Sequence, residues 1–246
     1  MVGRNLLPAL TDILLRWRRH RYVMAADVEK MYRQILVHED DRNLQQIMWR
    51  RHSEHELTTF CLNTVTYGLA CAPFLAVRTL QQLARDENNK FPRGSSVLLQ
   101  DVYVDDILTG ADTIDDALQI QTQLIQLCKA GDFPLKKWAA NSNQLIEAIP
   151  EEDRMKLESR SWTPQEASHS MLGLLWSPTA DCFTFAARLP AEDPVTKRSI
   201  LAQTAQLFDP LGWLTPIVIY AKIIIQSAWL LGLDWDTPLP EREATR

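Results

Sequence analysis

The sequence predicts an α+β fold in which helices back one face of an antiparallel sheet. Two apolar segments, at 22–28 and 96–110, have the residue types of strands, and each contains aspartate. Elsewhere apolar residues recur at helical spacing, and the tail beyond Pro190 is helical in pattern. With 246 residues, of which 46% are apolar and 23% charged, the chain can bury a substantial core and has a globular composition.

The first part of the chain alternates helix and strand signals. Apolar spacing defines the helices, and short apolar runs bounded by polar turns define the strands. The predicted elements are a helix over 6–17, a strand over 22–28, a short helix or extended arm over 31–37, a polar connection over 38–42, an antiparallel pair at 44–49 and 57–65, and a helix that begins at Pro73.

The second part centres on 96–110, which predicts two short buried strands joined by a tight acidic turn. Asp112 or Thr113 can cap the next helix, which Gly131 ends. The later elements are a strand over 135–139, a short helix over 143–149, a linker over 150–161, a hairpin of 171–176 with 182–187, a helix around 200–208, and a helix from Pro216. Lys222 and Gln226 interrupt the apolar run of this last helix, so we expect a buried helix and not a membrane span.

The acidic turn is the main candidate for chemistry. Asp105 and Asp106 are adjacent between apolar strands, where two carboxylates are costly to ionise together unless a cation shares them. An isolated Asp-Asp pair is most often a plain turn. A second strand that ends in a carboxylate, Asp27, changes this balance, because two such strands at one sheet edge are the minimum for a two-metal phosphoryl-transfer site. Oxygen ligands of this kind suit Mg²⁺.

Six motifs in order then resemble the reverse transcriptases of BEL/Pao-class LTR retrotransposon polyproteins. The resemblance extends from about residue 6 to residue 235, and six weak motifs in the right order make a specific pattern. The motifs are Asp27 with Tyr32, Thr66-Tyr67-Gly68 with Ala72-Pro73-Phe74, Tyr103-Val104-Asp105-Asp106, Phe133-Pro134-Leu135-Lys136-Lys137-Trp138, Leu172-Gly173-Leu174-Leu175-Trp176 and Phe208-Asp209-Pro210-Leu211-Gly212.

The resemblance implies RNA-directed DNA synthesis with two Mg²⁺ ions, or Mn²⁺ in their place. It also implies roles for individual residues. Asp27 and Asp105 would bridge the metals, with the Val28 carbonyl as a further ligand and Asp106 as added charge; Tyr32 would be the steric gate against a ribose 2′-hydroxyl; Tyr67 and Gly68 would contact the nucleotide; Lys136 or Lys137 would be the general acid; and Leu172-Gly173 would support the primer.

The resemblance also implies the domain organisation and the partners. Residues 1–21 would be a remnant helix before the palm, 22–187 the polymerase palm, and 188–246 a helical thumb or connection segment. The part before the first motif is short for a fingers subdomain, so a polyprotein fragment is expected, with fingers and protease upstream and nuclease and integrase downstream. Its partners would be an RNA or DNA template with primer and deoxynucleoside triphosphates, in cytoplasmic retrotransposon particles.

A second function class stays open, because fingers and nuclease portions are not expected in this sequence and net charge is a poor test of nucleic-acid binding. The net charge of −5 is unexpected for a nucleic-acid enzyme, although positive residues need only line one groove, and 16–21 and 49–52 are two basic clusters that also contain tryptophan. The four cysteines form no CxxC pair, which argues against a zinc site. The alternative is an inactive retrotransposon-derived remnant that acts as a protein-interaction or structural module.

Overall fold

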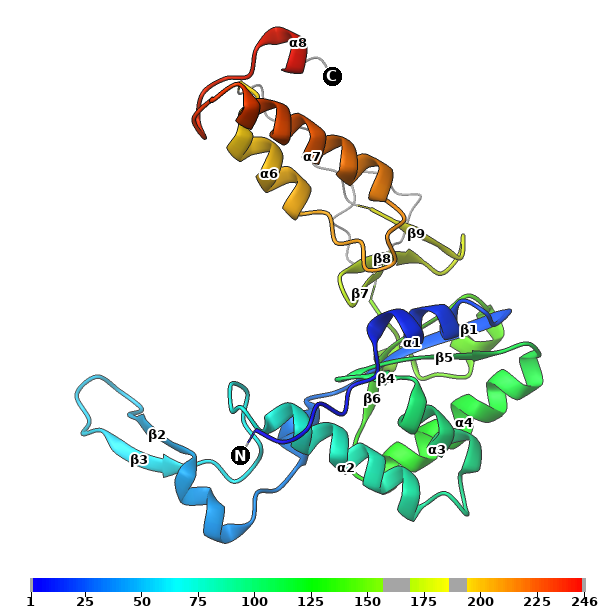
Figure 1. The fold of residues 1–246 in the computed structure, drawn as a ribbon. Coiled ribbons are helices and arrows are strands. Elements are labelled where there is room, and N and C mark those ends of the chain that lie inside the picture. The colour runs from blue at the N-terminus through cyan, green and yellow to red at the C-terminus, as the bar shows by residue number, and fades with distance from the viewer. Residues whose placement is uncertain (1, 157–168, 186–193, 245–246) are drawn as a thin grey trace. The chain divides into compact units, whose positions relative to one another are not determined.

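The computed structural model describes residues 2–156, 169–185 and 194–244. The chain divides into two compact units, residues 1–158 and 159–246, and we describe each by itself. Helices combine with antiparallel strands in both units (Figure 1). The predicted α+β class is therefore confirmed.

The first unit is built on a four-stranded antiparallel sheet. The strand order is β4 (Val102–Tyr103), β5 (Asp106–Ala111), β1 (Tyr22–Val28) and β6 (Leu135–Ala140). The two central strands, β1 and β5, pair over six residues. This pairing brings segments about 80 positions apart side by side, which is the arrangement that the two predicted aspartate strands required.

Alternation along β1 separates the two faces of this sheet. Met24, Ala26 and Val28 belong to the main core, where α2 (Ala72–Asp86), α3 (Pro92–Gln100) and α4 (Ile114–Ala130) pack beneath the sheet (Figure 1). Val23 and Ala25 are buried but lie outside that core, on the side of α1 (Leu10–Trp17). Since side chains alternate with period two, the next odd position, Asp27, shares the face of Val23 and Ala25.

Most helices follow their sequence signals. Pro73 lies in the first turn of α2, and the Thr113 hydroxyl caps α4 by accepting the Asp116 backbone N–H at 3.2 Å. The first helix starts only at Leu10, after Pro8, so the prediction of a helix from residue 6 was four residues too long. Short helical turns complete this part: η1 (Met31–Gln34), η2 (Glu39–Leu44), α5 (Asn143–Glu147) and η3 (Glu151–Asp153).

The prediction of a strand over 96–101 was wrong. These residues continue α3, which begins at Pro92, and only Val102 and Tyr103 pair with β5. The apolar run Val97-Leu98-Leu99 fits a strand and a helix equally well, and here packing decides. Gly94 lies so close to α4 that an added Cβ would approach the Gln123 backbone at 3.0 Å, so α3 and α4 pack along their length.

The predicted pair at 44–49 and 57–65 is confirmed as β2 (Gln46–Trp49) and β3 (Thr58–Cys61). This two-stranded ribbon projects away from the sheet of the first unit (Figure 1), and every residue of both strands is exposed. The basic cluster at 49–52 therefore lies at the loop that joins the two strands of an exposed ribbon.

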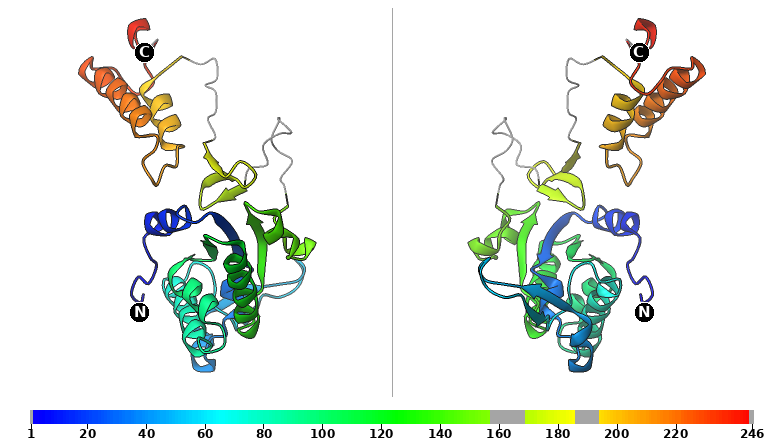
Figure 2. Two further views of the ribbon diagram at one scale, coloured as in Figure 1. Left: turned by 90° about the vertical axis from the view of Figure 1, so that its right-hand side faces the viewer. Right: turned by 90° about the vertical axis from the view of Figure 1, so that its left-hand side faces the viewer.

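The second unit holds a small sheet and a helix pair. β7 (His169–Met171), β8 (Leu174–Ser177) and β9 (Cys182–Thr184) form a meander. The predicted hairpin of 171–176 with 182–187 is found as β8 with β9, but Met171 belongs to β7, and 186–187 lie outside the described residues. Helices α6 (Lys197–Ala205) and α7 (Thr215–Leu230) lie side by side (Figure 2), and α8 (Glu241–Ala244) follows. Parts of the predicted linker and of the thumb segment, 157–168 and 186–193, lie outside the described residues.

The expectation that the helix after Pro216 is buried was wrong. Of the described residues of α7, only Ile225 and Ala228 are buried, and Ile217, Tyr220 and Trp229 are exposed. Hydropathy identifies an apolar helix but not what covers it. No helix in the described ranges is long and apolar enough to span a bilayer.

Candidate metal and nucleotide site

The carboxylates of interest meet at one end of the central strand pair. In the β1–β5 register Asp27 lies directly opposite Asp106, and Asp105 precedes Asp106 in the turn from β4. Side chains of directly opposed residues share one face of a sheet. Asp27 and Asp106 thus share the face turned away from the main core, and Asp105 lies next to them in the turn.

The turn that carries Asp105 is tight and strained. Tyr103 pairs with Asp106, so only Val104 and Asp105 connect the two strands. Val104 has φ +58°, a left-handed conformation that is unfavourable for a β-branched residue. The Val28 backbone N–H donates to the Asp105 carbonyl at 2.8 Å, which fixes the turn to the end of β1.

A β-bulge separates the roles of the two adjacent lysines. The β1–β6 register shifts between Ala25 and Asp27, so that two residues of β6, at 137 and 138, oppose one of β1, and Lys137 has φ +53°. The Lys137 ammonium consequently reaches Asp27 Oδ2 at 3.0 Å. Lys136 instead forms an ion pair with Asp153 of η3, a partner that the sequence analysis did not identify.

Burial and the repulsion between neighbouring carboxylates raise the pKa values of both Asp105 and Asp106. Partial burial, followed by the negative charges of Asp105 and Asp27, raises the pKa of Asp106 to about 6, against the opposing effect of Lys137. Burial also raises the pKa of Asp105, with a contribution from Asp27. A group of hard oxygen donors that resists ionisation is chemically suited to Mg²⁺, because a cation removes the repulsion.

Side-chain convergence is incomplete in this structure. Within the described ranges, no three His, Cys, Asp or Glu side chains are arranged as a ready metal-binding cluster. Asp27 is oriented by Lys137, whose ammonium takes part of the carboxylate's bonding capacity. The donor set fits a hard divalent cation by chemical type, and the backbone holds the three carboxylates at neighbouring positions.

Two tyrosines lie beside these carboxylates. Tyr32 of η1 is 9% exposed, and its ring meets that of Tyr67 edge to face, with centroids 4.8 Å apart. Burial, and then the charge of Asp105, raises the pKa of Tyr32, so this phenol is near the acidic turn. Gly68 follows with φ +87° and open space where a Cβ would be, so its backbone conformation, not crowding, requires glycine.

The Leu172-Gly173 pair belongs to the second unit. Both residues have positive φ, +50° and +82°, and they form the turn from β7 to β8. A Cβ on Gly173 would meet the Phe208 ring at 2.9 Å, so this turn packs against the segment after α6.

The shifted pKa of Asp106 generates a test of the site's electrostatics. A carboxyl whose pKa rises from 3.8 to about 6 on folding stabilises the protein below pH 4, and this contribution is lost as the pH rises through 6. Asp106→Asn removes the ionisation, so the variant should be more stable than the wild type above pH 6, by about 1 to 2 kcal/mol after solvent screening, and equal near pH 4. Urea unfolding at several pH values, with EDTA present, measures this difference. A constant difference across the range would contradict it.

Comparison with known proteins agrees with this geometry. Residues 3–138, more than half of the chain, match the family described as reverse transcriptase (RNA-dependent DNA polymerase). Residues 196–246, which include α6 and α7, match the family described as Pao retrotransposon-like RNaseH-like domain. No curated protein matches the chain. The chain therefore belongs to the reverse transcriptase family, and its two matches together identify it as a reverse transcriptase of the Pao class of retrotransposons.

Proposed function

We propose that this chain catalyses template-directed addition of deoxynucleotides to a primer, with Asp27, Asp105 and Asp106 as the catalytic carboxylates. The observation that carries the proposal is the β1–β5 register, which opposes Asp27 to Asp106 and leaves Asp105 in the intervening turn. Two strand ends that present carboxylates on one face provide the scaffold for phosphoryl transfer assisted by two metals.

Asp27 and Asp105 would hold two Mg²⁺ ions, or Mn²⁺, together with the Val28 carbonyl, and Asp106 would add negative charge beside them. Such ions activate the primer hydroxyl and neutralise charge on the triphosphate. The chain's own contribution is position. The Val28 to Asp105 hydrogen bond and the paired strands fix the backbone that carries the carboxylates before substrate arrives, which reduces the ordering left for the reaction step.

The proposed partners follow from this reaction and from the family. They are an RNA or DNA template with its primer, deoxynucleoside triphosphates, and the other parts of a retrotransposon polyprotein, in the setting of cytoplasmic particles. Leu172-Gly173, as the β7–β8 turn, is proposed to support the primer strand.

The central test is primer extension on an RNA template with deoxynucleotides and Mg²⁺. We expect Asp105→Asn to reduce the extension rate by roughly 10²-fold or more, because it removes a preorganised charge from the reacting phosphates. The variant should remain folded, since Asp105 lies in a turn and is partly exposed.

Circular dichroism of the variant provides the control for folding. Extension that is equally fast with and without the Asp105 carboxylate would refute the catalytic assignment. A wild-type chain that binds primer and template but does not extend the primer would refute the proposed activity for this chain.

The bulge at Lys137 supports the assignment of the general acid to this lysine and not to Lys136. The Asp27 hydrogen bond, ahead of the nearby carboxylate charges, raises the pKa of Lys137, so it holds a proton at neutral pH that it can donate to the departing pyrophosphate. Lys136 is already paired with Asp153, the main cause of its own raised pKa.

The two lysines form a matched pair of variants. We expect Lys137→Met to slow single-turnover extension by about 10²-fold, because general acid catalysis typically contributes that much. Lys136→Met should leave the rate nearly unchanged, because the ion-pair partner of Lys136 is Asp153 and not Asp27. Pre-steady-state quench-flow measures the rates. The reverse ranking of the two variants would contradict the assignment.

Tyr32 is proposed as the gate that excludes a ribose 2′-hydroxyl, and Tyr67 as the residue that holds its ring in place. The edge-to-face contact at 4.8 Å restrains Tyr32 at the end of η1. An aromatic contact of this kind is worth about 0.5 to 1.5 kcal/mol. Loss of the Tyr67 ring would therefore loosen the gate without removing it.

Discrimination between deoxynucleotides and ribonucleotides tests this pair. Tyr32→Val should lower the ratio of kcat/KM for the two substrates by tenfold or more, on the order of a pocket contact. Tyr67→Ala should lower it by about 2- to 10-fold, and Tyr67→Phe, which keeps the ring, should leave it unchanged. Equal ratios for Tyr67→Ala and wild type would show that Tyr67 does not position the gate.

A further inference from the structure

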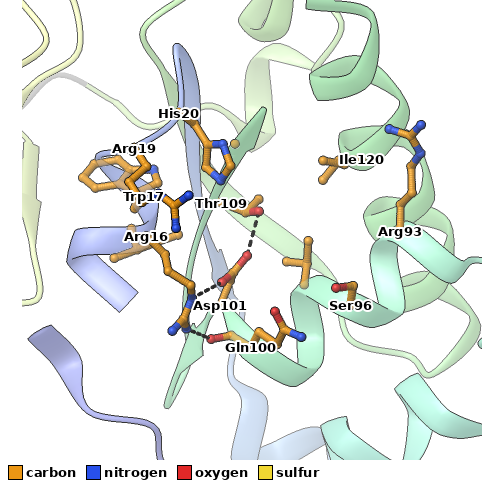
Figure 3. Close-up of a pocket in the computed structure, with 13 residues that line it drawn as sticks. Arg16, Trp17, Arg19, His20, Arg93, Ser96, Gln100, Asp101, Thr109 and Ile120 are labelled. Carbon is orange, nitrogen blue, oxygen red and sulfur yellow. Dashed lines mark hydrogen bonds and ion pairs between the residues drawn. The ribbon is translucent and has the colours of Figure 1, made fainter. Parts of the chain in front are cut away.

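A cavity of about 360 Å³ lies at the edge of the sheet in the first unit, along β5 from Asp106 (Figure 3). It exists because β4 is only two residues long and pairs with Asp106 and Ile107 alone. Beyond that point the wall of the cavity is formed by Thr109 and Gly110 of β5, by α3, and by the end of α1 with the turn that follows it. The carboxylates proposed for catalysis are not among the residues that line it.

Positive charge dominates the lining. Arg16, Arg19, His20 and Arg93 line the cavity, and Asp101 is the one acidic residue among the lining residues. Arg93 lies across the cavity from the other two arginines (Figure 3). Arg93 is paired at 2.6 Å with Asp116, which does not line the cavity. In a chain with a net charge of −5, guanidinium donors gathered around a hollow still favour an anionic ligand.

The single carboxylate is already paired within the protein. One Asp101 oxygen accepts from Arg16 Nε at 3.3 Å, and the other accepts from the Thr109 hydroxyl at 3.0 Å. Arg16 also donates to the Gln100 carbonyl, so Asp101 and Gln100 hold its guanidinium in a fixed orientation. The remaining guanidinium donors of Arg16 stay available to a ligand, since an arginine has five.

Arg19 and His20 supply two further nitrogen donors. Arg19 is exposed, and within the described ranges its guanidinium has no ion-pair or hydrogen-bond partner. His20 Nδ1 is buried without a hydrogen bond, and the nearest carboxylate oxygen, Asp112 Oδ1, is 3.6 Å away. A buried polar atom without a partner is unfavourable, and an oxygen of a bound ligand can accept from it when it carries the proton.

The lining also indicates which anion fits. Trp17 is its only aromatic residue other than His20, and it is 1% exposed, so no free aromatic face is offered for stacking on a base. Several arginine donors around a polar hollow match the oxygens of phosphate. We propose that this cavity binds a phosphate group, and that the phosphate belongs to the backbone of the bound nucleic acid. The choice of nucleic acid rests on the proposed function, whereas the phosphate chemistry does not.

Arg19→Gln tests the proposal, because Arg19 is exposed and its guanidinium has no ion-pair or hydrogen-bond partner in the part of the chain that the structure describes. Fluorescence anisotropy of a labelled primer–template duplex gives the dissociation constant at several salt concentrations. We expect the variant to bind the duplex about tenfold more weakly. The slope of log K against the logarithm of the salt concentration should be smaller in magnitude by about one. Arg85→Gln, at an exposed arginine in the last turn of α2, is the matched control and should change neither. Identical behaviour of the two variants would overturn the proposal.

A second arm separates the sources of phosphate. Inorganic phosphate and pyrophosphate are titrated against the melting temperature of wild type and Arg19→Gln. Stabilisation of the wild type only, together with weaker duplex binding by the variant, supports a backbone phosphate site. Stabilisation with unchanged duplex binding would overturn the nucleic-acid assignment. Asp105→Asn should bind the duplex as the wild type does, so a failure of catalysis remains distinguishable from a failure of this site.

Discussion

The pairing of β1 with β5 is the constraint on which the rest of the first unit depends. Its register sets Asp27 against Asp106, and a shift by one residue would turn Asp27 towards the core and Ala26 towards solvent. Gly110 helps to fix this register, since a Cβ there would lie 2.3 Å from the Tyr22 carbonyl oxygen. Only glycine allows the two strands to approach so closely at this end. Because the six residue pairs of β1 and β5 are consecutive, the register set here also sets the pairing of the aspartates at the other end.

Several unfavourable features of the first unit lie at that acidic end. Val104 and Lys137 both have positive φ, the pKa of Asp106 is raised to about 6, and the β1–β6 register is interrupted there. Each costs free energy in the folded state, of order 1 to 3 kcal/mol for a strained residue. The core offsets these costs with closely packed helices beneath the sheet, where residues such as Leu80, Leu124 and Leu127 are almost fully buried. Concentrated strain beside a cluster of carboxylates is typical of a functional site and not of a structural turn.

Sequence patterns predicted the frame of this site better than its details. Asp27, Asp105 and Asp106 each follow an apolar segment, so their meeting at one sheet edge was predictable from alternation and strand pairing. The helix over 92–100 was not, because Val97 to Leu99 suit either structure and the close packing on α4 decides. Lys136 and Lys137 were indistinguishable in sequence, since a bulge depends on the partner strand and leaves no local signature without glycine. Likewise Asp101 drew no attention, although Arg16, Thr109 and a two-residue strand make it the centre of a cavity wall.

One strand also connects the two charged regions of opposite sign. Asp106 begins β5, and Thr109 and Gly110, three and four residues later, border the basic cavity. At about 3.4 Å per residue the separation along the strand is roughly 10 to 14 Å. Because β5 is paired with β1 over its whole length, this spacing is rigid. The arginines around 16–19 are gathered at the Gly110 end of β5, whereas Asp106 lies at its first residue. A chain with net negative charge can thus hold a polyanion near its own carboxylates. The low overall charge then reflects how the cations are placed, and not a poor fit to nucleic acid.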